Sequence, residues 1–125
     1  MGKDTDRDIF SQIVNLISEC KTLIETINDN KYVAHIVTQP TDQVAAIGAD
    51  AVFSLSANNV KSYQWQYSTD NEEHWSNSNA SGNKTDTMTT QANEARYGYF
   101  YRCKITGLDN NTIYSNSVKI LRPET

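Results

Sequence analysis

The chain has 125 residues, and its 11 Lys and Arg against 15 Asp and Glu give a formal charge of −4. This length supplies one ordinary hydrophobic core, and a hydrophobic share of 38% excludes a disordered chain. The acidic balance and the absence of a Lys/Arg cluster exclude the electrostatic footprint of nucleic-acid binding. The longest apolar run, residues 44–47, excludes a membrane span, and no apolar signal-peptide core follows Met1, so we expect no secretion signal.

The first predicted element is one N-terminal α-helix of the coiled-coil type, within a predicted unit of residues 1–32. Apolar residues recur there at intervals of three and four, without proline. Isoleucine at heptad positions a and d, with a further apolar row at g, favours three strands over two. Residues 28–30, Asn-Asp-Asn, end the pattern. The predicted oligomer interface consists of Ile9, Phe10, Ile13, Leu16, Ile17, Cys20, Leu23, Ile24 and Ile27.

The apolar face of this helix is too wide to remain in water, so it requires a cover. Self-association as a homotrimer is the interpretation that the heptad pattern favours. Packing on the unit that follows is a second interpretation, because only a short linker at residues 28–33 separates the two. Docking on another protein of a larger assembly is the third.

From residue 33 to residue 125 the hydrophobic period changes from helical to twofold. Short alternating runs, separated by Gly, Asn, Asp and Ser, predict an all-β sandwich of seven to eight strands. Pro40 lies between the first two runs, which fits a strand that changes sheet. The predicted strands cover residues 34–39, 43–47, 51–57, 62–68, 85–90, 99–106 and 113–121, with a short additional one at 74–76.

Alternation along these strands assigns an inner face to each of them. Burial of such side chains contributes about 1.5 to 3 kcal/mol each, so the unit requires no disulfide. Cys20 falls in the predicted helix and Cys103 in a strand, and we expect two free, buried thiols. The predicted inner positions are Phe53, Leu55, Tyr63, Trp65, Tyr67, Tyr101, Cys103, Ile105, Val118 and Ile120.

Two motifs of the predicted sandwich are distinctive: Tyr-Gln-Trp-Gln-Tyr at 63–67, leading to Trp75, and Tyr-Arg-Cys at 101–103. With Thr-Gln-Pro at 38–40 and Ser-Asn at 115–116, they resemble the immunoglobulin-like domains of tailed-phage structural proteins and bacterial surface proteins, over residues 34–121. The resemblance implies a core tryptophan, Trp65, and a tyrosine corner at Tyr101. Phe53 and Leu55 stand where antibody domains carry the second cysteine of a disulfide, so the implied core signature is Phe53, Leu55, Trp65, Tyr101 and a free Cys103.

The sequence predicts no catalytic residues, no cofactor-binding residues and no metal ligands. The five glycines are isolated, and the Cys and His residues have no ligand spacing. His74 stands beside Glu72 and Glu73, and we interpret this segment as a solvated turn rather than a catalytic group. His35 is expected at the surface or half-buried. The chain is therefore predicted not to be an enzyme.

Surplus aromatic residues raise the possibility of a binding platform. Most are expected to pack within the sandwich, but Tyr97 and Tyr114 flank predicted turns and are the candidates for surface binding. The Asn-, Ser- and Thr-rich segment 76–90 is the longest loop and is compatible with weak, carbohydrate-type binding. The aromatics considered are Tyr67, Trp75, Tyr97, Tyr99 and Tyr114.

The resemblance implies a non-enzymatic virion protein of a tailed phage, namely a head fibre, decoration or tail-appendage subunit. Such a protein would be made in the host cytoplasm and released by lysis. Its expected partners are copies of itself, other virion proteins and bacterial surface glycans, bound weakly and multiplied by avidity. The alternative is an immunoglobulin-like spacer or adhesion module of a bacterial surface or secreted protein.

Overall fold

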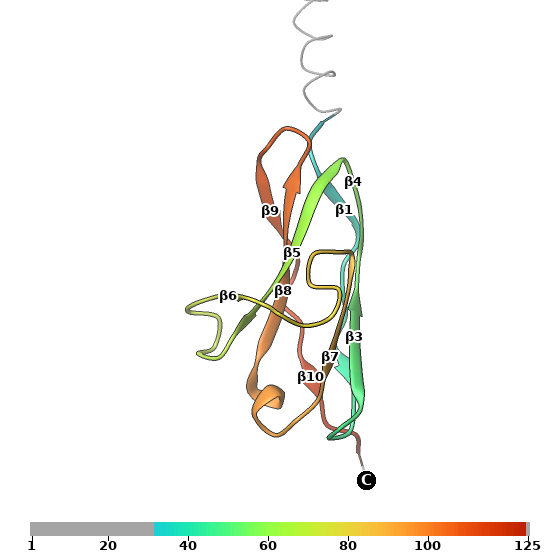
Figure 1. Ribbon diagram of the computed structural model, residues 1–125, viewed down its shortest axis with the longest axis vertical. Helices are drawn as coiled ribbons and strands as arrows, with labels where there is room; N and C mark the ends of the chain where they lie inside the picture. The colour runs from blue at the N-terminus through green and yellow to red at the C-terminus, as the bar shows by residue number, and fades with distance from the viewer. Residues whose placement is uncertain (1–31, 125) are drawn as a thin grey trace, which may run out of the picture. The chain divides into compact units, whose positions relative to one another are not determined.

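The computed structural model describes residues 32–124 (Figure 1). The predicted helix and its interface residues lie outside this range. No helix within the described range is long and apolar enough to cross a membrane. The described residues form ten strands and one 3₁₀ turn: β1 (His35–Thr38), β2 (Gln43–Val44), β3 (Asp50–Ser54), β4 (Ser56–Asn58), β5 (Val60–Ser68), β6 (Ser76–Asn77), β7 (Thr87–Gln91), η1 (Ala95–Gly98), β8 (Phe100–Gly107), β9 (Thr112–Tyr114) and β10 (Ile120–Leu121).

The strands form two layers, with β3 and β7 on one side of Figure 1 and β5, β8 and β9 on the other. In the first layer β3 pairs with β7, and β1 pairs with β4, both antiparallel. The second layer has the order β6-β5-β8-β9. A bridge between Tyr101 and Val118 connects β8 to the segment that leads into β10, which pairs in parallel with β2. This arrangement confirms the all-β, immunoglobulin-like sandwich for the described residues.

The number of strands exceeds the seven to eight predicted because two predicted strands are each divided. The run 51–57 divides at Leu55, where the pairing partner changes from β7 to β1. The run 113–121 divides because the chain leaves the β8 ladder after Tyr114. There the backbone N–H of Cys103 donates to the Ser115 hydroxyl at 2.8 Å. The alternation of apolar residues indicates side-chain direction but not a change of the paired strand. The prediction therefore merged β3 with β4 and β9 with β10.

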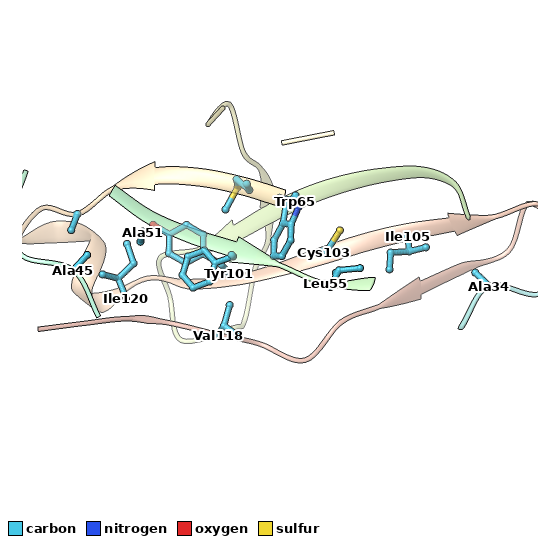
Figure 2. Close-up of a cluster of buried hydrophobic side chains, with 13 residues drawn as sticks. Ala34, Ala45, Ala51, Leu55, Trp65, Tyr101, Cys103, Ile105, Val118 and Ile120 are labelled. Atoms are coloured by element: carbon cyan, nitrogen blue, oxygen red, sulfur yellow. The ribbon is translucent and has the colours of Figure 1, made fainter. Parts of the chain in front are cut away.

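The core lies between the two layers (Figure 2). Phe53, Trp65, Met88, Cys103 and Ile105 are completely buried. The ring of Phe53 lies 5.2 Å from that of Tyr101 and 6.3 Å from that of Trp65, measured between centroids. Thus one residue of β3 joins aromatic side chains of β5 and β8 across the sandwich. Leu55, Val118 and Ile120 are also buried, at positions that alternation assigns to the inner face. Tyr63 and Tyr67, predicted at inner positions as well, are only partly buried against this core.

The segment between β6 and β7 passes from one layer to the other (Figure 1). Its backbone lies against the edge of Trp65. The indole Nε1–H donates to the Thr85 carbonyl at 2.8 Å, and the Trp65 backbone N–H donates to the Asn83 carbonyl at 2.7 Å. Strand β7 therefore starts at Thr87 rather than at Thr85. Because the backbone of 83–85 bonds to the core tryptophan, this loop is part of the packed structure.

Cys103 is a free, buried thiol, and burial raises its pKa to about 12. The structure does not form the tyrosine corner expected at Tyr101. The Tyr101 side chain is buried, but its hydroxyl has no hydrogen-bond partner. The hydroxyl of Tyr97 on η1 instead donates to the Ala45 carbonyl at 2.6 Å and ties η1 to the segment after β2. A tyrosine corner is defined by a hydrogen bond from the tyrosine hydroxyl to the backbone, and Tyr101 lacks this bond, so the tyrosine corner expected at Tyr101 is wrong.

Candidate binding surface

The outer face of the four-stranded sheet carries a cluster of aromatic and polar side chains around Arg102. Residues Tyr101 and Cys103 point into the core, so alternation along β8 directs Arg102 outward. Its guanidinium carbon lies 4.2 Å from the ring centroid of Trp75 and 4.0 Å from that of Tyr114. The guanidinium is therefore held between two aromatic rings, each a favourable cation–π contact.

A row of hydrogen bonds fixes the arginine along the sheet. Gln66 lies directly opposite Arg102 in the β5–β8 ladder, and the Arg102 Nε–H donates to its side-chain oxygen at 3.0 Å. The amide group of Gln66 in turn donates to the side-chain oxygen of Asn77 on β6 at 3.1 Å. We call Gln66, Trp75, Asn77, Arg102 and Tyr114 the Arg102 face. It carries one positive charge and no acidic side chain, and it presents the residue types that dominate binding hot spots.

The structure places the two predicted surface tyrosines in different surroundings. Tyr114 is 47% exposed and belongs to the Arg102 face. Tyr97 is half-buried, with its hydroxyl bonded to Ala45 and its ring 4.4 Å from the guanidinium carbon of Arg122. Tyr97 is therefore committed to contacts within the fold, and the two tyrosines do not form one platform.

Of the other aromatics considered, Trp75 joins the Arg102 face, whereas Tyr67 and Tyr99 stack on each other with centroids 5.7 Å apart. Sequence reasoning missed Arg102 and Gln66. Alternation does place Arg102 on the outer face, but its ring partners come from β9 and from the turn before β6. The register that brings these segments together is a property of the folded sheet.

The turn after β5 brings together Asp70, Glu73 and His74, each offering one metal-ligand atom within 4.8 Å of the others. The Asp70 carboxylate already accepts bonds from the Ser68 hydroxyl at 2.8 Å, the His74 backbone N–H at 2.9 Å and the His74 ring Nδ1 at 2.5 Å. The His74 side chain is 84% exposed. These contacts close the turn, as expected for a solvated turn.

The residue types of a catalytic triad occur in this turn, but their order is different. In a triad the histidine lies between the serine and the acid, so that it takes the serine proton. Here Asp70 lies between Ser68 and His74 and bonds to both. Ser68 is also 99% buried, with a 1% exposed fraction. The histidine cannot activate this serine, and the cluster has a structural role.

The bonds from His74 and Ser68 lower the pKa of Asp70 from 3.8 to about 2. The ionised carboxylate therefore stabilises the fold fully above about pH 4, and this contribution is lost as the pH falls toward 2. We expect Asp70→Asn to lower the urea midpoint at pH 6 and to flatten its decline between pH 4 and 2. Glu73→Gln, a neighbouring charge change that leaves the three bonds to the Asp70 carboxylate in place, is the matched control and should keep the native urea midpoint at pH 6. Parallel profiles for the native chain and Asp70→Asn would contradict this assignment.

Fold and surface together define an immunoglobulin-like sandwich whose outer sheet face carries a structured arginine between two aromatic rings. Residues 34–122 match the family described as Domain of unknown function (DUF8696), and the chain belongs to this family. No curated protein matches the chain.

Among solved structures the chain is similar to D1 of Duf (Kirre), with 17% identity over 74% of this chain and 100% of that one, at a TM-score of 0.48. A complex of titin M10 with obscurin-like 1 Ig matches at 16% identity over 74% and 97%, with a TM-score of 0.47. Dpr1 IG1 bound to DIP-eta IG1 matches at 15% identity over 72% and 97%, with a TM-score of 0.46. At these identities the likeness does not extend to function.

Proposed function

We propose that this chain is a non-enzymatic recognition module that binds its partner through the Arg102 face. The observation that carries the proposal is the guanidinium of Arg102 held between the rings of Trp75 and Tyr114. Tryptophan, tyrosine and arginine provide large contact areas and directed hydrogen bonds at little cost in conformational entropy when they are already held in place. Aromatic rings also stack on sugar rings and guanidinium groups bind their oxygens, so bacterial surface glycans are the proposed ligands.

We place the module on the virion of a tailed phage, as a head fibre, decoration or tail-appendage subunit. The motifs of residues 63–67 and 101–103 support this setting through their resemblance to phage structural domains. A bacterial surface or secreted protein remains the alternative setting. In either setting one domain binds weakly, and display of several copies raises the overall affinity.

Self-association through residues 1–32 would supply these copies. Light scattering of the intact chain should give the mass of a trimer, and Ile17→Asp with Ile24→Asp should give a monomer whose β unit unfolds at an unchanged temperature. Asn15→Asp with Thr22→Asp, which adds the same charges at heptad position f, should remain trimeric. A native chain that is monomeric would contradict the trimer, and loss of the thermal transition in the isoleucine variant would mean that the helix packs on the sandwich.

The binding proposal is tested on an array of purified bacterial capsular polysaccharides and lipopolysaccharides. We expect the native chain to bind a subset of them, and Arg102→Ala to bind that subset roughly 30-fold more weakly, the loss typical of a hot-spot residue. Val52→Ser, on the outward face of β3 in the other layer, is the matched control and should bind like the native chain. Absence of glycan binding by the native chain, or equal binding by Arg102→Ala, would overturn the proposal.

A further inference from the structure

A second site lies at the edge of the sandwich, on the inner side of the sheet whose outer side carries the Arg102 face. It is a pocket of about 380 Å³, between β5, β7, β8, the start of the β6–β7 loop and the β7–η1 loop. This volume falls within the range of small-molecule sites. Its walls include the stacked rings of Tyr67 and Tyr99, the side chain of Tyr101, and Arg96.

The Tyr101 side chain lines this pocket, and its hydroxyl lacks a hydrogen-bond partner. Tyr101 is 3% exposed, and its hydroxyl is the one buried side-chain polar atom of residues 32–124 that lacks a hydrogen-bond partner. A buried hydroxyl without a partner is costly, and native proteins rarely leave one. Burial raises the pKa of Tyr101 to about 12, against smaller opposing effects of the Arg96 charge and of the Thr90 hydroxyl, which lies close by but outside hydrogen-bond geometry. The group is therefore a protonated donor near neutral pH, and an acceptor atom of a ligand would satisfy it.

The charge of the pocket selects the ligand further. Among the described residues that line it, Arg96 alone carries a charge. The Arg96 Nη1 donates to the Gln91 carbonyl at 2.7 Å, and its backbone N–H donates to the Asn93 side chain at 2.8 Å, so the residue is held in place. The bond to Gln91 uses one of five guanidinium N–H donors. The remaining donors suit a carboxylate, which guanidinium groups bind through two parallel hydrogen bonds.

Two further features point to a ring-shaped, hydroxylated ligand. The stacked Tyr67 and Tyr99 rings form an aromatic wall, with the ring planes 19° apart. Ser78 and Asn79 add polar groups on the side of the β6–β7 loop. We propose that this pocket binds a carboxylate-bearing monosaccharide unit, with its carboxylate on Arg96 and a hydroxyl or ring oxygen accepting a hydrogen bond from the Tyr101 hydroxyl. This inference goes beyond the proposed function, because it uses residues on the opposite side of β8.

The test is a titration of the ¹⁵N-labelled full chain with D-glucuronate, followed by amide NMR shifts. We expect a saturable response at Asn79, Asn93 and Arg96. D-glucose lacks the carboxylate and acetate lacks the ring, so each should bind at least roughly tenfold more weakly than D-glucuronate. Binding of acetate as tightly as glucuronate would overturn the sugar assignment in favour of a simple anion site. Absence of a saturable response to glucuronate would overturn the proposal as a whole.

Variants separate this site from the Arg102 face. Arg96→Gln and Tyr101→Phe should each weaken glucuronate binding roughly tenfold. Tyr101→Phe should leave the urea midpoint unchanged or higher, because it removes an unsatisfied group. Arg102→Ala should bind glucuronate like the native chain, because Arg102 does not line the pocket. A negative result on the glycan array would therefore contradict binding by the Arg102 face but not binding by the pocket. Full affinity in Arg96→Gln, or a clearly lowered midpoint in Tyr101→Phe, would overturn the proposal.

Discussion

Trp65→Ala should lower the free energy of unfolding by about 3 to 5 kcal/mol, the range of large-to-small aromatic substitutions in cores. Trp65 is completely buried beside Phe53, and its indole N–H bonds to the Thr85 carbonyl. The substitution would leave a cavity and an unpaired carbonyl in the loop that covers the tryptophan. Urea unfolding followed by circular dichroism measures this loss without depending on tryptophan fluorescence.

Two controls separate volume from hydrogen bonding. Trp75→Ala removes a tryptophan from the half-exposed Arg102 face, and we expect a loss within about 1 kcal/mol. Trp65→Phe keeps an aromatic ring but removes the bond to Thr85, and its loss should lie between the other two. A cost for Trp65→Ala no larger than that of Trp75→Ala would contradict the role of Trp65 as the centre of the core.

Gly82→Ala should destabilise the chain by about 3 kcal/mol or more, the sum of an unfavourable backbone conformation and a steric clash. Gly82 has φ of +78°, in the left-handed region. A Cβ atom at this position would lie 2.1 Å from the Thr87 carbonyl oxygen, so the loop or the start of β7 must move. The same loop bonds to Trp65, and its displacement would uncover the edge of the core.

Two other glycines serve as matched controls for this prediction. Gly48 has φ of +90° but open space around it, so Gly48→Ala reports the backbone cost alone, about 1 kcal/mol. Gly98 has open space and no left-handed φ, so Gly98→Ala should be nearly neutral. Thermal and urea unfolding of the three variants should therefore rank Gly98, Gly48 and Gly82 in order of increasing loss. Equal losses for Gly48→Ala and Gly82→Ala would contradict the packed position of the loop.

The local sequence pattern predicted only part of the Arg102 face. Alternation along β8 places Arg102 on the side opposite Tyr101 and Cys103, and Tyr114 stands near a turn. Nothing in the spacing pairs Arg102 with Trp75, because the turn after β5 must fold back before the two side chains meet. The pocket around Tyr101 was even harder to predict from the sequence, because its walls come from five separate segments.

The twofold hydrophobic period of residues 33–125 by itself determined an all-β unit and the inward direction of Phe53, Leu55, Trp65 and Cys103. These features depend on side-chain direction along a strand, which the sequence carries locally. The tertiary structure decided the change of pairing partner at Leu55, the loop bonded to Trp65, and the unpartnered hydroxyl of Tyr101. Each of these depends on register and packing between segments distant in sequence, and an alternating pattern contains no information on either.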